Sequence, residues 1–292
     1  MSPLVTISIP AYKTEFFEVA LKSAIGQSYS NLEIIVSDDS SGSGIEEVCG
    51  KYRNVKYRRR TSKEIMNQLD ILYIGNGQLI KPLFDDDVLH PFCVERMVNS
   101  LWNADKASFC FSSSAVIDVA NRVTNRRRPF QQSGIISGEN VRTGLVKSMR
   151  NFIGEFSTIM VKRDVLDLFA KDSLFCHWGE DFSLGLADVA CYLNLAFENN
   201  VIYIDEELSY FRKDSDLDSN SNHTVNKNFI YCITHWIDFL MLAKKNNFIS
   251  HIDAEEALPK VKLLVNSWIK TYPELRKHLG LYESYINDKN LT

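Results

Sequence analysis

The first forty residues alternate between β-branched apolar runs and a stretch with helical spacing. Residues 4–9 form an apolar run that Pro10 ends, and residues 16–27 then carry apolar side chains at helical spacing. Residues 32–36 form a second apolar run, which ends in a polar cluster. Runs with few polar positions are typical of parallel strands that are buried on both faces. We therefore predict a strand–helix–strand unit and an α/β fold.

The alternation of strand and helix patterns continues to about residue 205. A polar segment rich in Ser, Asp and Asn follows, and amphipathic helices begin near residue 226. We predict an α/β domain over residues 1–215 and a C-terminal helical extension over residues 216–292. Apolar faces on these last helices would suit a homo-oligomer.

Composition and charge narrow the classes of protein to consider. The 292 residues are 45% hydrophobic, enough for a sizeable core, and the net charge of −4 gives no general attraction to nucleic acid. We interpret the arginine triplets at residues 58–60 and 126–128 as solvated loops. The six cysteines lack metal-ligand spacing, and no apolar stretch is long enough to span a membrane. We expect a cytoplasmic protein with no transmembrane segment, free or peripheral at the inner face of the membrane.

Three adjacent carboxylates, Asp85, Asp86 and Asp87, follow the apolar residues Leu83 and Phe84. Like charges repel and cost free energy to desolvate, so an acidic triplet behind an apolar run usually has a cation nearby. Hard oxygen ligands suit Mg2+ or Mn2+, and these ions suit a diphosphate. A solvated acidic turn is the alternative interpretation of the triplet taken alone.

Ligands of open α/β sheets bind beyond the carboxyl ends of the strands. Three such places carry suitable groups here: Pro10, Ala11 and Tyr12 after the first strand, Asp38 and Asp39 after the second, and the acidic triplet after a later one. A tyrosine can stack on a base, and a carboxylate can accept from an imide or a ribose hydroxyl. Taken singly, Tyr12 can equally be a packing residue and the Asp pair a helix cap.

These segments, taken in order, resemble family 2 glycosyltransferases with the GT-A fold. The resemblance rests on VTISIPAY at 5–12, AIGQSY at 24–29, LEIIVSDDSS at 32–41, Asn67, GQLI at 77–80, the acidic triplet, residues 154–158 and WGED at 178–181. It covers about residues 4–212 and leaves the C-terminal helices outside. It implies a GT-A catalytic domain with a mixed, mostly parallel central sheet.

The resemblance assigns a nucleotide-sugar site to the ends of the first strands. It implies that Pro10, Ala11 and Tyr12 bind the base and ribose of the nucleotide. Asp39 is then expected to accept from the uracil edge, and Asn67 to join the same site.

The resemblance also implies a divalent metal, Mn2+ or Mg2+, at the acidic triplet. Asp86 aligns with the principal metal ligand, and Asp87 is expected to join the metal site, either by ligating through water or by orienting a group that ligates the metal. Asp85 is then expected to contact the ribose or the donor sugar. Phe84 stands where many family members carry another Asp, which is a departure from the family pattern.

The late part of the resemblance supplies the expected catalytic groups. Asp181 matches the family's general base, which takes the proton of the acceptor hydroxyl as it attacks the anomeric carbon. The alternative for the Glu180–Asp181 pair is a cap on a helix over residues 182–195. Arg212 or Lys213 is expected to close over the diphosphate. Many members carry a His where this chain has Asp214, and both Asp214 and His223 stay open as a further metal ligand.

The resulting hypothesis is a metal-dependent, inverting glycosyltransferase. It would move a hexose or N-acetylhexosamine from a UDP-sugar to a hydroxyl of a glycan, glycolipid or glycoprotein. A sugar nucleotidyltransferase is the first alternative, but that class needs a Gly-rich basic loop after the first strand, where this chain has Pro10 to Thr14. A non-catalytic subunit that keeps the fold and binds a partner or a nucleotide is the second.

Overall fold

The computed structural model describes residues 2–213 and 222–287, and the chain divides into two compact units. The first unit comprises Met1–Gly138, Phe152–Leu174 and Glu198–Asp214, and the second comprises Glu139–Asn151, Phe175–Phe197 and Ser215–Thr292. The two units alternate along the chain, whereas the sequence pattern favours a single division at residue 215. That domain assignment stays a prediction.

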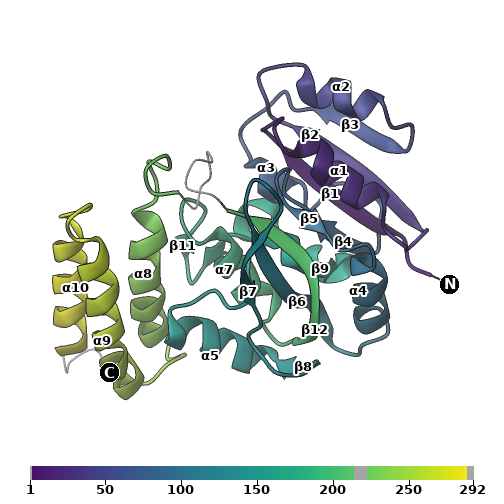
Figure 1. Ribbon diagram of the computed structural model, residues 1–292. Helices are drawn as coiled ribbons and strands as arrows, with labels where there is room; N and C mark the ends of the chain where they lie inside the picture. The colour runs from purple at the N-terminus through teal and green to yellow at the C-terminus, as the bar shows by residue number, and fades with distance from the viewer. Residues whose placement is uncertain (1, 214–221, 288–292) are drawn as a thin grey trace. The chain divides into compact units, whose positions relative to one another are not determined.

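A mixed sheet forms the first unit, with the strand order β3-β2-β1-β4-β9-β6-β12-β5 (Figure 1). Its strands are β1 (Val5–Ala11), β2 (Leu32–Asp38), β3 (Val55–Arg59), β4 (Leu79–Pro82), β5 (Val88–Leu89), β6 (Ala107–Ile117), β9 (Ile159–Lys162) and β12 (Asn200–Arg212), with β7 (Val123–Arg127) beside β6 and β8 (Gly134–Ser137) beside β12. The pairs of β1 with β2 and β4, of β2 with β3, and of β6 with β12 are parallel. The predicted α/β class is confirmed.

The helices of the first unit bury their apolar faces in one core on the sheet. This core joins side chains of α1 (Phe17–Ile25), α2 (Gly44–Gly50) and α4 (Cys93–Leu101) to the strands. All seven residues of β1 are buried, as expected for a central strand with parallel neighbours on both sides. The shorter elements are α3 (Asn67–Asp70), α6 (Arg163–Leu166), and the 3-10 turns η1 (Phe156–Thr158) and η2 (Lys171–Ser173).

Two local predictions are wrong in the first unit. The pattern suggests separate strands at residues 109–111 and 115–119, but β6 is one strand of eleven buried residues, because Ser112, Ser113 and Ser114 also lie inside the sheet. The arginine triplets are not solvated loops either. Arg58 and Arg59 end β3, and Arg126 and Arg127 end β7. Each arginine of both triplets forms an ion pair with a carboxylate.

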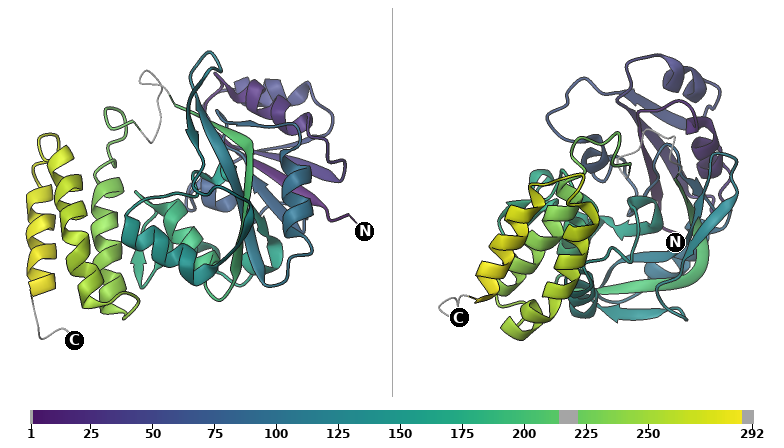
Figure 2. Two further views of the ribbon diagram at one scale, coloured as in Figure 1. Left: turned by 60° about the horizontal axis from the view of Figure 1, so that its bottom comes forward. Right: turned by 60° about the vertical axis from the view of Figure 1, so that its left-hand side comes forward.

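The second unit contains a group of three helices, which lie side by side in both views of Figure 2. They are α8 (Tyr231–Lys245), α9 (His251–Trp268) and α10 (Leu275–Asn287), and the unit also holds nearly all of α5 (Gly138–Ser148), α7 (Ala187–Leu195), and the hairpin of β10 (Cys176–His177) and β11 (Glu180–Asp181). A capping box between Ser250 and Asp253 begins α9. Phe239 of α8 stacks on Phe182 at 3.8 Å between ring centroids, inside the core of the unit.

No helix among residues 2–213 and 222–287 is both long enough and apolar enough to cross a membrane.

Candidate active site

The acidic triplet begins with a carboxylate that ties two strand ends together. Asp85 Oδ2 accepts hydrogen bonds from the backbone N–H groups of Tyr12 and Lys13, at 2.7 and 2.8 Å. Asp85 is 8% exposed, and this burial raises its pKa to about 6, with the charge of Asp86 adding to the rise and the two N–H donors opposing it. The loop after β1 and the turn after β4 therefore form one structure.

Asp86 and Asp87 differ from Asp85 in what surrounds them. The side chain of Asp86 is 15% exposed and faces the ammonium group of Lys13 at 3.7 Å. Asp87 is fully buried, and its Oδ1 accepts from the N–H of Arg212 at 3.1 Å. Burial raises the pKa of Asp86, and raises that of Asp87 well above its usual range. Two desolvated carboxylates side by side favour a nearby cation.

The acidic turn fits a divalent cation that is shared with a ligand. Asp87 Oδ2 forms no hydrogen bond of normal geometry with any described residue, although the Ser157 hydroxyl lies near it. Within residues 2–213 and 222–287, no group of three or more His, Cys, Asp or Glu side chains is arranged to hold a metal. Mg2+ commonly binds through one or two carboxylates, with phosphate oxygens and waters completing its shell. Asp86 and Asp87 match that pattern.

Phe84, the departure from the family pattern, is a packing residue. Its N–H donates to Ser157 Oγ at 3.0 Å, and its ring meets that of Phe156 edge to face. The carbonyl of Ser157 accepts from the buried ammonium group of Lys81 at 2.6 Å. The turn is thus anchored to η1 at Phe84.

Arg212, at the end of β12, stabilises the acidic turn through hydrogen bonds. Its side chain is fully buried, with Nε donating to the Asp86 carbonyl at 2.9 Å and Nη1 donating to the Asp118 carbonyl at 2.6 Å. Nη2 donates to Asn121 Oδ1 at 2.7 Å, and the guanidinium lies over the ring of Phe16. Contact between Arg212 and a diphosphate stays a prediction.

The end of β2 lies against the end of β1. The N–H of Asp39 donates to the carbonyl of Ala11 at 2.8 Å, and the register pairs Pro10 with Ser37. Asn67 Nδ2 donates to the Ser37 carbonyl at 2.7 Å. The sequence-predicted residues Pro10, Ala11, Tyr12, Asp39, Asn67 and Asp85 therefore gather at one edge of the sheet.

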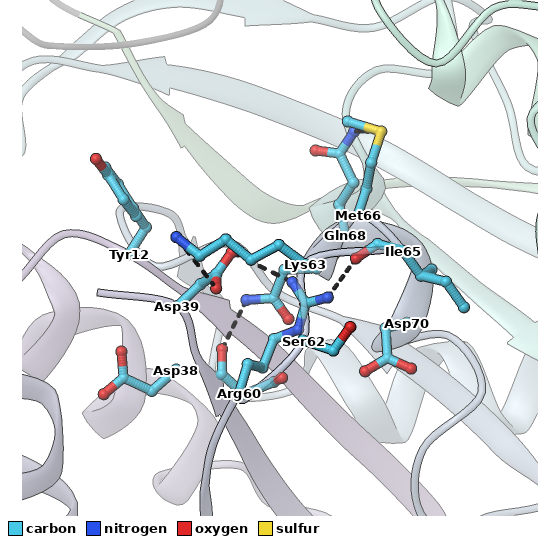
Figure 3. A network of polar contacts seen from close by, with 12 residues as sticks. Tyr12, Asp38, Asp39, Arg60, Ser62, Lys63, Ile65, Met66, Gln68 and Asp70 are labelled. Carbon is cyan, nitrogen blue, oxygen red and sulfur yellow. Dashed lines mark hydrogen bonds and ion pairs between the residues drawn. The ribbon is translucent and has the colours of Figure 1, made fainter. Parts of the chain in front are cut away.

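Asp38 and Asp39 have separate tasks. Asp38 is buried and accepts from the Ser40 N–H and the Tyr57 hydroxyl, so it fixes the turn. Asp39 is partly exposed, and among the described residues its Oδ1 has no hydrogen-bond partner. Figure 3 shows Arg60 and Lys63 reaching toward it, with ion-pair distances of 3.2 and 4.0 Å.

Arg60 and Lys63 are residues that the sequence analysis missed at this site. Their only sequence signal is a basic stretch after an apolar strand, which is also common on ordinary surfaces. A cavity of about 290 Å3 adjoins this loop, lined by Arg58, Arg59, Arg60, Thr61, Ser62, Glu64, Ile65 and Asp70.

Asp181 belongs to the second unit and is exposed. It ends a tight hairpin, in which Trp178 and Gly179 adopt positive φ angles of 50° and 85°. Its carboxylate accepts from the N–H and the hydroxyl of Ser183, at 2.8 and 3.0 Å. The capping alternative is wrong, because α7 begins at Ala187 and Asp181 lies in β11.

The structure does not test either of the two open metal-ligand candidates. Asp214 lies outside the described residues. His223 is exposed, and its ring lies 5.1 Å from that of Trp268 and 5.9 Å from that of Phe229. A metal-binding role for either residue stays a prediction.

Solved structures share this fold at low sequence identity. A fragment of S. aureus TarS in complex with UDP-GlcNAc matches with a TM-score of 0.66 and 14% identity, over 97% of this chain and 81% of that chain. The mannosyltransferase PcManGT of Pyrobaculum calidifontis, in complex with GDP-Man and Mn2+, matches with a TM-score of 0.54 and 13% identity, over 98% and 85%. These matches confirm the predicted GT-A fold with additional C-terminal helices.

Sequence comparison identifies relatives over less than half of this chain. An uncharacterized glycosyltransferase of Rickettsia prowazekii is 31% identical over 115 residues, which is 37% of this chain and 36% of the relative. CgeD of Bacillus subtilis is 27% identical over 135 residues, or 42% and 32%. The matches span about a third of the length of these curated relatives. The sequence profile described as glycosyl transferase family 2 matches residues 6–169, more than half of the chain. The chain therefore belongs to glycosyl transferase family 2, a family of transferases.

Proposed function

We propose that this protein transfers a hexose or N-acetylhexosamine from a UDP-sugar to a hydroxyl of a glycan, glycolipid or glycoprotein. The observation that carries the proposal is the carboxylate of Asp85, which holds the loop after β1 against the acidic turn. These hydrogen bonds join the loop of Tyr12, which we assign to the nucleoside, to the acidic turn, which we assign to the diphosphate. Tyr12, 61% exposed on a fixed backbone, then stacks on the base, and Asp39 accepts from the uracil imide.

The reaction needs a proton acceptor and a means of neutralising the leaving group. In the proposal, Asp181 takes the proton of the acceptor hydroxyl while that oxygen attacks the anomeric carbon from the side opposite UDP. Attack from that side inverts the anomeric configuration. A divalent cation at Asp86 and Asp87 would supply positive charge for the departing phosphate. The bonds from Ser183 orient Asp181, and Asp85 and Arg212 hold the acidic turn in place.

Relatives support this choice of donor and metal without deciding either. TarS has been solved with UDP-GlcNAc, and PcManGT with GDP-Man and Mn2+. We favour uridine here because Asp39 Oδ1, which has no hydrogen bond among the described residues and only a 4.0 Å ion pair with Lys63, is an acceptor for an imide N–H.

A panel of donors tests the proposal. Thermal unfolding and donor hydrolysis are measured with UDP-, GDP- and CMP-sugars, with and without Mn2+. We expect UDP-sugars with Mn2+ to raise the unfolding temperature and to be hydrolysed slowly, since water can replace the acceptor. A response to GDP or CMP alone would contradict the choice of uridine. A protein that responds to no nucleotide would instead fit a non-catalytic subunit, which the packing of Phe84 in place of a carboxylate makes the second candidate.

A further inference from the structure

Lys13 supplies a positive charge at the acidic turn. Its ammonium nitrogen lies 3.7 Å from Asp86 Oδ2, and the side chains of Lys13 and Asp86 are 30% and 15% exposed. The distance exceeds that of a normal hydrogen bond, so the attraction is mainly Coulombic. Lys13 therefore faces the carboxylate to which the metal role is assigned.

A second cation at the turn, Arg212, is held very differently. Its three guanidinium nitrogens donate to the carbonyls of Asp86 and Asp118 and to the amide oxygen of Asn121. Moving it would leave these bonds unmade in a buried site, which is costly. Lys13 loses one long, partly solvated ion pair when it moves, and such pairs contribute little free energy.

The backbone of Lys13 is nevertheless fixed. Its N–H donates to Asp85 Oδ2 at 2.8 Å, next to the equivalent bond from Tyr12. The ammonium group is therefore carried by a long, partly exposed side chain whose backbone is fixed. It lies between Tyr12 and the acidic turn.

We propose that Lys13 is a counter-cation that Asp86 exchanges for the divalent metal, and that the released ammonium group then binds the diphosphate of the donor. This inference rests on the proposed function. Repulsion between the metal and the ammonium group drives the exchange, and the phosphate oxygens supply the new partner. Lys13 thus opposes metal binding in the free protein and favours donor binding once metal is present.

The two parts of the inference predict effects of opposite sign in Lys13→Met, which keeps the length of the side chain and removes its charge. In calorimetric titrations without donor, we expect the variant to bind Mn2+ about tenfold more tightly than the wild type. At saturating Mn2+, we expect it to bind UDP about tenfold more weakly, because a charge-assisted hydrogen bond is lost. Lys13→Arg should keep UDP binding near the wild-type level.

Lys22→Met is the matched control, because Lys22 is a lysine of the same unit with an exposed ion pair to Glu18. It should change neither titration, and the unfolding temperatures of all variants should agree with the wild type. Weaker or unchanged Mn2+ binding by Lys13→Met would overturn the exchange, and unchanged UDP binding would overturn the diphosphate contact. A wild-type protein that binds neither Mn2+ nor UDP would contradict the proposed function itself, and with it the inference.

Discussion

The two carboxylate groups singled out by the sequence have opposite environments. Asp85 and Asp87 are 8% and 0% exposed; Asp85 accepts from two backbone N–H groups of the loop after β1, and Asp87 accepts from that of Arg212 at the end of β12. Asp181 is exposed at the end of a short hairpin, and its partner Ser183 is two residues away. One group is fixed by tertiary structure and desolvated, whereas the other is local and hydrated.

This difference matches two different chemical tasks. A carboxylate that positions charge benefits from burial, because electrostatic interactions are stronger where water is excluded. A carboxylate that accepts a proton from an incoming hydroxyl must be reachable by that hydroxyl. We infer that the buried turn holds the donor and that the exposed hairpin serves the acceptor.

The largest expected effect is on turnover, from the exposed carboxylate. Asp181→Asn should lower kcat about a thousandfold, because an amide cannot take the proton. UDP affinity and unfolding temperature should stay unchanged, since the amide oxygen can still accept from the Ser183 N–H. Steady-state kinetics with calorimetry of UDP checks this, with Glu256→Gln on the exposed face of α9 as the control. Turnover near the wild-type level would remove Asp181 from the base position.

The next effect is on metal dependence, from the buried turn. Asp86→Ala should abolish the gain in UDP affinity that Mn2+ provides, a loss of about ten- to hundredfold at saturating metal. Calorimetry with and without Mn2+ measures it. Asp105→Ala, an exposed acid of the same unit, should behave as the wild type. Undiminished metal dependence would exclude Asp86 as a ligand.

A stability measurement tests the comparison without any ligand. Asp85→Ala leaves the N–H groups of Tyr12 and Lys13 unpaired, so we expect the free energy of unfolding to fall by about 2 kcal/mol at pH 7. Asp181→Ala should cost about 0.5 kcal/mol or less, because water replaces its partners. Urea denaturation gives both values. Equal losses would contradict the contrast between the two carboxylate groups.

The smallest effect is on pH dependence in the second unit, where burial sets two pKa values on α8. Burial raises the pKa of Asp238 to about 6, with the charge of Glu180 adding to the rise and His278 opposing it. Burial lowers the pKa of His235 to about 4, and Asp181 opposes that shift. Asp238 therefore stabilises the fold fully below about pH 4, and this contribution is lost as pH rises through about 6. His235 stabilises it above about pH 6.5, and this contribution is lost as pH falls toward 4.

Two variants separate these opposing contributions. Urea denaturation at pH 4 and pH 7 gives the free energy of unfolding of each protein. The quantity compared is the wild-type value minus the value of each variant. For Asp238→Asn this difference should fall by about 1 kcal/mol as pH rises, and for His235→Asn it should rise by a similar amount. Differences that do not change with pH would show that neither group is desolvated in solution.

The central strands and the candidate donor residues could be predicted from the sequence because their signals are local. Residues 4–9 and 32–36 are continuous apolar runs, and the side chains after them gather because parallel strands end at the same edge. β6 was predicted as two strands because its three central serines look like a turn, whereas burial of serine depends on neighbouring strands. The start of α7 was placed too early, because the apolar spacing of residues 182–195 does not reveal the turn that precedes Ala187.

The supporting contacts of the site could not be predicted, because they join residues far apart in the chain. Arg212 meets the acidic turn 126 residues away, since β12 and β5 are neighbours in the sheet. Asp85 accepts from N–H groups more than 70 residues away. Backbone N–H groups carry no residue-specific signal, so the sequence does not distinguish a carboxylate that binds a ligand from one that holds a loop.

The most direct test of the central claim is calorimetric titration of UDP in EDTA, comparing the wild type with Asp39→Ala. Without metal, the acidic turn contributes least, and recognition of the uracil edge by the end of β2 is measured nearly alone. Loss of a hydrogen bond to a charged acceptor predicts that Asp39→Ala binds UDP about tenfold more weakly. Unaltered affinity would contradict a uridine site at this edge of the sheet.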